Sequence, residues 1–227
     1  MQLKIYQENA IDDLLAKSKR LLGYSGSKKL VFKSPTGSGK TIMMAEFLKR
    51  LVNDKEVRQS LGFIWTAPRQ LYIQSRDKLE SYFENTRVLK CSFFEDLDDR
   101  KIRENEILFF NWESINRADN IYIRDNELDF NLSKVLERTK EEGREIILII
   151  DEAHHHATSE ISQGLIQMIG PKLTIEVTAT PATITDEDEK VFVQLEDVKR
   201  EGMIKKGVIL NDNFENFIKE GKIKTQK

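Results

Sequence analysis

The sequence S-P-T-G-S-G-K-T occupies residues Ser34–Thr41. A β-type run at Lys29–Lys33 precedes it, and a helical pattern at Ile42–Leu51 follows it. This order of strand, loop and helix is the context that a phosphate-binding loop requires. Its glycines allow a tight turn that points N–H groups inward, and a helix N-terminus behind the loop favours an anion. The residues that we expect to bind nucleotide phosphates are Pro35, Thr36, Gly37, Ser38, Gly39, Lys40 and Thr41.

Two side chains of this loop have distinct expected roles. Lys40 supplies a mobile cation for the β- and γ-phosphates, and Thr41 supplies a hydroxyl for Mg²⁺. The general pattern G-x-x-x-x-G-K-[ST] has glycine where this chain has Ser34. Serine is small, and we expect the loop to hold it. An ordinary Gly/Ser turn before a lysine is the alternative, and the flanking strand and helix argue against it.

Composition narrows the class of protein further. The 227 residues carry a formal net charge of −2, so any nucleic-acid contact must come from a local patch rather than from the whole surface. Cys91 is the single cysteine, which excludes an internal disulfide framework and indicates a reducing compartment. We interpret it as a core residue. No run approaches the roughly 20 apolar residues of a membrane span, and the N-terminus lacks a signal-peptide pattern. A cytoplasmic protein without a membrane partner is expected.

Apolar patterns predict strands and helices in alternation along the chain. The expected strands are Lys29–Lys33, Leu61–Ala67, Val88–Phe94, Ile107–Trp112, Glu145–Asp151, Leu173–Thr180 and Val191–Leu195. The expected helices are Gln7–Leu22, Ile42–Leu51, Gln70–Phe83, Leu132–Glu142 and Ile161–Ile169, with an acidic turn at Asp186–Lys190. The branched apolar run inside Glu145–Asp151 indicates a strand buried on both faces, as in a parallel sheet. We therefore predict an α/β domain with a mostly parallel sheet.

Asp151-Glu152-Ala153-His154 follows that buried strand, at the edge where open α/β sheets bind ligands. Asp151 is placed to hold Mg²⁺, directly or through its waters, and Glu152 to orient and deprotonate a water. A GTPase or a small-molecule kinase does not need this glutamate, whereas a hydrolase that attacks with water does. An acidic helix N-cap is the alternative interpretation of the pair.

These motifs together resemble those of superfamily-two DEAD/DEAH-box helicases. Ser34–Thr41, D-E-A-H at 151–154 and T-A-T-P at 178–181 resemble motifs I, II and III in order and spacing. T-A-P-R-Q-L at 66–71 resembles motif Ia, and Tyr6-Gln7 resembles the glutamine element before motif I. The segments 110–120 and 201–211 resemble the restriction (Res) subunits of type III restriction enzymes. The resemblance covers nearly the whole chain.

The resemblance implies a RecA-like P-loop NTPase domain, with helices on both faces of the sheet, that uses ATP and Mg²⁺. It implies that Lys40, Asp151 and Glu152 are catalytic and that Thr41 and Asp151 hold the metal. Gln7 would contact the adenine edge through its amide, which gives a preference for ATP. An exposed residue at a helix start is the alternative for Gln7.

The resemblance also implies contacts beyond the nucleotide. His154, Thr178, Ala179 and Thr180 would couple the γ-phosphate state to a partner domain and to nucleic acid. Arg69 and Gln70 would meet a nucleic-acid backbone, with DNA favoured over RNA. The alternative for Thr178 and Thr180 is that they are ordinary strand threonines. The alternative for Arg69 and Gln70 is a solvated helix start. His155 and His156 are not expected to bind a transition metal, because adjacent histidines do not converge easily on one ion.

Motors of this kind place ATP between two RecA-like domains. Residues 1–210 account for the first domain, and residues 211–227 for a polar tail or the start of a linker to an absent second domain. The sequence shows neither an arginine-rich motif nor a nuclease pattern after Pro181. We therefore expect weak ATP binding, slow hydrolysis and no unwinding by this chain alone, and a possible modification or specificity subunit as a partner.

Three competing functions stay open at this point. The motifs do not separate a DNA helicase from an RNA helicase, since only 2′-hydroxyl contacts would discriminate. An ATP-dependent nucleotide sensor without motor action would carry the same loop. A small-molecule kinase is disfavoured because it needs neither Glu152 nor T-A-T-P.

Overall fold

The computed structural model describes residues 2–111, 131–153, 160–180, 185 and 188–204. Within these residues, one sheet has the strand order β3-β4-β2-β5-β6-β1-β7, and every pairing in it is parallel. The strands are β1 (Lys28–Lys33), β2 (Leu61–Ala67), β3 (Lys90–Ser92), β4 (Glu106–Asn111), β5 (Glu145–Asp151), β6 (Leu173–Thr178) and β7 (Glu189–Phe192). The predicted parallel α/β architecture is confirmed.

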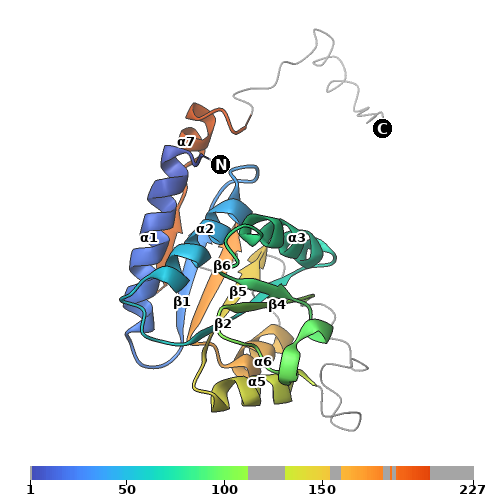
Figure 1. Ribbon diagram of the computed structural model, residues 1–227. Coiled ribbons are helices and arrows are strands. Elements are labelled where there is room, and N and C mark those ends of the chain that lie inside the picture. The colour runs from blue at the N-terminus through green and yellow to red at the C-terminus, as the bar shows by residue number, and fades with distance from the viewer. Residues whose placement is uncertain (1, 112–130, 154–159, 181–184, 186–187, 205–227) are drawn as a thin grey trace, which may run out of the picture.

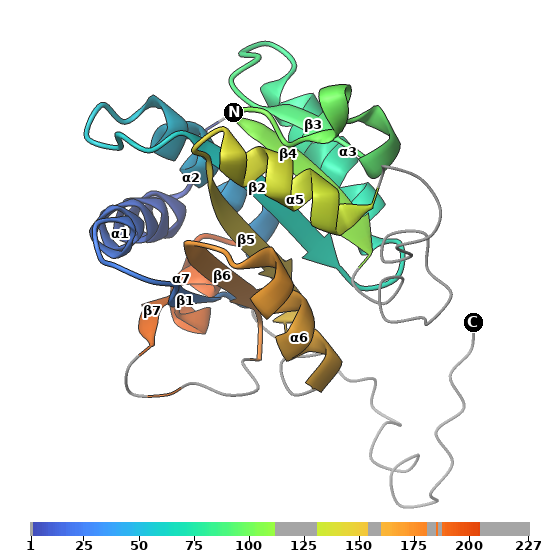
Figure 2. The ribbon, with the colours of Figure 1, turned by 90° about the horizontal axis from the view of Figure 1, so that it is seen from below.

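Helices cover both faces of this sheet (Figures 1 and 2). The helices are α1 (Ile5–Leu22), α2 (Lys40–Asn53), α3 (Leu71–Phe83), α5 (Leu132–Glu141), α6 (Glu160–Ile169) and α7 (Leu195–Arg200). Figure 2 shows α5 and α6 on one side of the strands and α1, α2 and α3 on the other. Among the described residues, no helix has the length and apolar character needed to cross a membrane.

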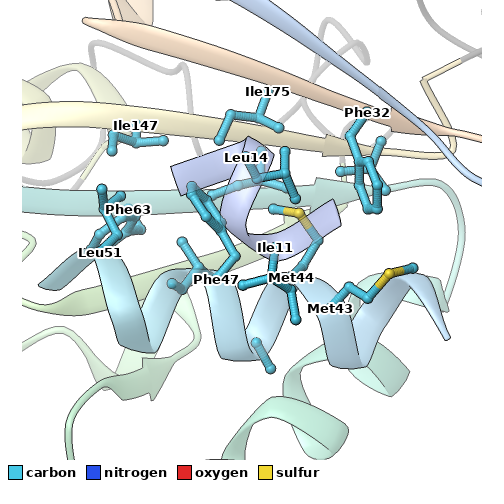
Figure 3. Close-up of a cluster of buried hydrophobic side chains, with 14 of the residues drawn as sticks. Ile11, Leu14, Phe32, Met43, Met44, Phe47, Leu51, Phe63, Ile147 and Ile175 are labelled. Carbon is cyan, nitrogen blue, oxygen red and sulfur yellow. The ribbon is translucent and has the colours of Figure 1, made fainter. Parts of the chain in front are cut away.

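Two apolar clusters fill the spaces between the sheet and its helices. The larger cluster lies under α1, α2 and α3, where Phe47 and Leu51 of α2 meet Phe63 of β2 (Figure 3). The second cluster lies under α5 and α6, and its members include Leu136, Ile169 and Leu148. Successive residues of β5 thus enter different clusters, because side chains alternate across a strand. This double burial explains the continuous apolar run of β5.

The strand order brings distant parts of the chain to one edge of the sheet. β6 lies between β1 and β5, with Lys33 paired to Thr178 and Asp151 paired to Val177. All strands are parallel, so the segments that follow β1, β5 and β6 leave the sheet at the same edge.

Several predicted boundaries are wrong. The expected strand at Val88–Phe94 is only Lys90–Ser92, because Phe93 N–H donates to Asp96 Oδ2 at 3.0 Å and starts a 3₁₀ turn at Phe94–Asp96. The expected strand at Val191–Leu195 is instead Glu189–Phe192, since Glu189 pairs with Leu30, and Leu195 starts α7. Part of the expected acidic turn is therefore strand.

Two further boundaries differ near the motifs. α1 begins at Ile5 rather than Gln7, because Gln7 Oε1 accepts from the N–H of Lys4 at 2.9 Å and caps the first turn. β6 ends at Thr178 rather than Thr180, where Thr180 N–H donates to Thr178 Oγ1 at 3.2 Å. His154, Pro181, most of the segments 110–120 and 201–211, and the tail 211–227 lie outside the described residues.

Candidate nucleotide and nucleic-acid site

The loop between β1 and α2 is held at its base by serines. Ser34 N–H donates to Thr178 O at 3.0 Å, which joins the start of the loop to the end of β6. Ser34 Oγ and Ser38 Oγ lie 2.6 Å apart, and both side chains are fully buried. Serine at position 34 therefore fits the loop and adds a hydrogen bond across its base.

The top of the loop depends on glycines with left-handed backbone. Gly39 has φ +88°, and a Cβ there would lie 2.6 Å from Gln7 Nε2. Gly37 has φ +81°, and a Cβ there would lie 3.0 Å from Ile204 Cγ2, beyond α7. The left-handed backbone favours glycine at both positions, and at Gly39 an added Cβ would also displace the Gln7 amide.

The first turn of α1 packs against this loop. Tyr6 Oη donates to Ser38 O at 2.7 Å, and Gln7 Nε2 donates to the same carbonyl at 3.0 Å. Gln7 is only 3% exposed, so it is not the exposed helix-start residue of the alternative interpretation. Burial raises the pKa of the Tyr6 hydroxyl and keeps it a neutral donor. No sequence pattern predicted the Tyr6 hydrogen bond.

Lys40 and Glu152 meet across this edge of the sheet. Lys40 Nζ lies 3.7 Å from Glu152 Oε1 and 3.4 Å from Ser34 O. Glu152 has φ +52°, a left-handed conformation that costs a non-glycine residue roughly 1 kcal/mol or more. Non-glycine residues held in this conformation concentrate at functional sites.

Asp151 is the most strongly perturbed carboxyl of the site. Burial, and then the neighbouring charge of Glu152, raise the pKa of Asp151 to about 6. Lys40 and the N–H of Glu152, which lies 3.0 Å from Oδ1, act in the opposite direction. Ser75 Oγ of α3 also donates to Asp151 Oδ2, at 3.4 Å. No sequence signal pointed to Ser75, because its contact with Asp151 depends on how α3 packs against β5.

The residues present fit a nucleotide with a divalent cation. The glycine-shaped loop and the Lys40 ammonium suit phosphates, and a buried carboxyl with a raised pKa is stabilised by a nearby cation. Thr41 and Asp151 offer only oxygen ligands, which Mg²⁺ prefers.

The remaining predicted residues occupy different places along the edge. Thr178 is fully buried, Ala179 is half-buried and Thr180 is exposed. Arg69 and Gln70 are exposed at the end of β2, so that β5 and β6 separate them from the loop after β1. Pro35, Lys40 and Thr41 are half-buried, and Thr36 is exposed.

The fold and the site together define a P-loop nucleotide-binding domain of the helicase type. A family model described as "Type III restriction enzyme, res subunit" matches residues 1–183. The chain therefore belongs to the type III restriction enzyme res-subunit family. Domains of this helicase class generally act as ATPases that use ATP and Mg²⁺. Among curated proteins, no significant match is found.

Two of the solved structures that share the fold contain DNA or a mimic of it. One is a nuclease-deletion mutant of the Type ISP restriction-modification enzyme LlaGI in complex with a DNA substrate mimic, with a TM-score of 0.57 and 16% identity. The match covers 97% of this chain and 22% of that chain. The other is the SWI2/SNF2 ATPase core of Sulfolobus solfataricus in complex with dsDNA, with a TM-score of 0.51 and 18% identity, over 87% of this chain and 35% of that one. The chain thus spans about a quarter to a third of these neighbours.

Proposed function

We propose that the chain is the ATP-binding N-terminal motor domain of a DNA helicase or translocase in a type III restriction-like enzyme. The observation that carries this proposal is the contact of Lys40 with Glu152, 3.7 Å apart, beside the buried Asp151. In this proposal, a phosphate-binding lysine (Lys40), a metal-binding carboxyl (Asp151) and a water-activating carboxyl (Glu152) lie together at one edge of a parallel sheet.

Each residue has a separate role in this proposal. Lys40 binds the β- and γ-phosphates, and Thr41 and Asp151 hold Mg²⁺. Glu152 leaves the Lys40 ammonium when phosphate takes its place, and then accepts a proton from the attacking water. Gln7 contacts the adenine edge from its position against Ser38 O.

The partners are assigned by analogy and by position. Both structural neighbours were solved with DNA or a mimic of it, which supports DNA over RNA. Arg69 and Gln70 contact the nucleic-acid backbone, and His154 with Thr178, Ala179 and Thr180 couples that contact to the phosphates.

The proposed boundaries are residues 1–210 for this domain and 211–227 for a tail or linker. A second RecA-like domain completes the ATP site, a modification or specificity subunit is a further candidate partner, and we place the enzyme in the cytoplasm.

Nucleotide binding and hydrolysis test the proposal directly. We expect a fluorescent ATP analogue to bind with Mg²⁺, Lys40→Ala to weaken that binding at least about tenfold, and Glu152→Gln to retain it. Lys49→Ala, which removes a half-buried lysine of the same helix that pairs with Glu46, is the control. Hydrolysis is then measured with single- and double-stranded DNA and RNA.

Each alternative function has its own outcome in that experiment. Stimulation by RNA alone would identify an RNA helicase domain. ATP binding without a response to any nucleic acid, even after addition of a second motor domain, would identify a nucleotide sensor. Equal ATP binding by wild type and Lys40→Ala would refute the proposal.

A further inference from the structure

A groove with aromatic walls lies at the same edge of the sheet, beside the first turn of α3. Its volume is about 240 Å³, and Tyr72, Ile73, Phe93, Glu95, Phe110 and Asn111 are among its lining residues. We call it the ring groove. β4 ends at Asn111, opposite Ala67 at the end of β2. The groove therefore opens at the edge that carries Asp151, on the far side of β2 from β5.

Two rings of this groove are held in fixed positions while remaining partly exposed. Tyr72 and Phe93 meet edge to face, with centroids 5.9 Å apart and planes at 78°. The Arg76 guanidinium lies 5.0 Å from the centre of the Phe93 ring and lines a different pocket. Arg76 thus fixes Phe93 from outside the groove, since a cation is attracted to a ring face.

An exposed positive charge precedes these rings in the chain, three residues before Tyr72. Arg69 is exposed with φ +53°, in the turn that leads into α3. The first turn of that helix, Leu71–Gln74, contains no acidic residue, so its N-terminal partial charge is not offset there. Because Arg69 precedes Tyr72 by only three residues, a strand with a phosphate bound at Arg69 has a base within reach of Tyr72 and Ile73.

We propose that the ring groove receives one unstacked base of the nucleic-acid strand whose backbone Arg69 contacts. The inference rests on the proposed function. Stacking on an aromatic ring tolerates any base, because every base has a π-face. Glu95 and Asn111 at the groove place polar groups within reach of base edges.

Abasic substitution separates a base contact from a backbone contact. Two labelled single-stranded DNA oligonucleotides are compared by fluorescence anisotropy, one intact and one with a central run of abasic sites. Both carry the same number of phosphates. We expect wild type to bind the intact strand at least about fivefold more tightly. Tyr72→Leu and Phe93→Leu should bring this ratio close to one, and Tyr72→Phe should preserve it.

Three controls make the outcome specific. Tyr24→Leu removes another exposed tyrosine, whose ring centre lies 5.8 Å from Lys28 Nζ. Tyr24 lies near the start of β1, at the edge of the sheet opposite the ring groove. This variant should therefore leave the ratio of intact to abasic binding unchanged. Arg69→Ala should weaken both oligonucleotides equally. Thermal unfolding shows whether the leucine variants, which keep apolar volume, remain folded.

The experiment distinguishes a failure of the ring groove proposal from a failure of the proposed function. If wild type binds intact and abasic strands equally while Arg69→Ala weakens both, the ring groove proposal is wrong and the nucleic-acid function stands. The ring groove proposal is also wrong if Tyr72→Leu and Phe93→Leu remain folded and keep the wild-type ratio of affinities for intact and abasic strands. If wild type binds neither DNA nor the matching RNA strand, both ideas are overturned.

Discussion

Gly39 shows how one residue joins the phosphate-binding loop to the first turn of α1. An alanine there would need a left-handed backbone, which costs roughly 1–2 kcal/mol, and its Cβ would lie 2.6 Å from Gln7 Nε2. We expect Gly39→Ala to reduce stability in urea unfolding and to weaken nucleotide binding at least about tenfold, because either the loop or the Gln7 amide with its hydrogen bond to Ser38 O must shift.

Gly26→Ala is the matched control for this substitution. Gly26 also has a positive φ, +73°, but nothing lies within 4 Å of its added Cβ. It therefore reports the backbone strain alone, and nucleotide binding should not change. The interpretation would fail if both variants lost equal stability and both bound nucleotide normally.

The Asp151 carboxyl makes stability depend on pH. Its pKa in the folded chain, about 6, lies above that of an unfolded aspartate, because burial and Glu152 disfavour the charge more than Lys40 favours it. The protonated group thus favours folding below about pH 4, and this contribution is lost as the pH rises through about 6. Asp151→Asn removes that loss.

We expect the stability gain of Asp151→Asn over wild type to grow by about 1 kcal/mol between pH 5 and pH 7.5. Urea unfolding in the presence of a chelator measures it, with Asp77→Asn as a control, since that side chain is 62% exposed. A gain that stays constant across this range would contradict the assignment.

At the scale of elements, ionic contacts on Glu46 and Arg50 join three helices. Arg50 of α2 donates to Glu8 at 2.6 Å and to Asp12 at 2.9 Å, both on α1. It also donates to Glu46 through Nε at 3.0 Å, and Glu46 accepts from Tyr82 Oη of α3. Arg50 therefore holds two helices through a planar group that lysine cannot replace.

Arg50→Ala and Arg50→Lys should each cost about 2 kcal/mol in urea unfolding, because Glu46 is largely buried and loses a charged donor. Lys49→Ala, which removes a neighbouring lysine 3.2 Å from the same carboxylate, should cost less than about 1 kcal/mol. Equal losses for Arg50→Ala and Lys49→Ala would show that the contact between helices adds nothing.

Helices and strands were predictable from the sequence where a single local pattern, such as an apolar run or a glycine turn, was clear. The β5 run could only be a strand buried on both faces, and the loop glycines placed the start of α2 close to its position, at Lys40 rather than at the predicted Ile42. β3 and β7 were misplaced because edge strands have one neighbour, and pairing rather than hydrophobicity sets their length. Ser75 and the ring groove were missed because they arise where α3 packs on the sheet, a contact that has no local sequence pattern.

On the scale of the whole molecule, the candidate functional residues lie along a single edge of the sheet, where its parallel strands end. Lys40, Glu152 and Asp151 lie near its middle, and Arg69 and the ring groove lie toward β4. Among the described residues, Lys40 is the cation that lowers the pKa of Asp151. This chain covers only 22% and 35% of the two structural neighbours, and in the proposed function a second domain faces that edge.

An arginine supplied across such an interface accelerates phosphoryl transfer by about 10³–10⁵. We therefore expect the isolated chain to bind ATP and hydrolyse it at least about 10³-fold more slowly than the chain joined to a second RecA-like domain. Steady-state phosphate release with DNA measures both forms, and Glu152→Gln in each gives the background. Fast turnover by the isolated chain that Glu152→Gln abolishes would contradict this expectation. Its dependence on protein concentration would then show whether a second copy completes the site. The activity per molecule of a site shared between copies rises with protein concentration, whereas that of a self-contained site stays constant.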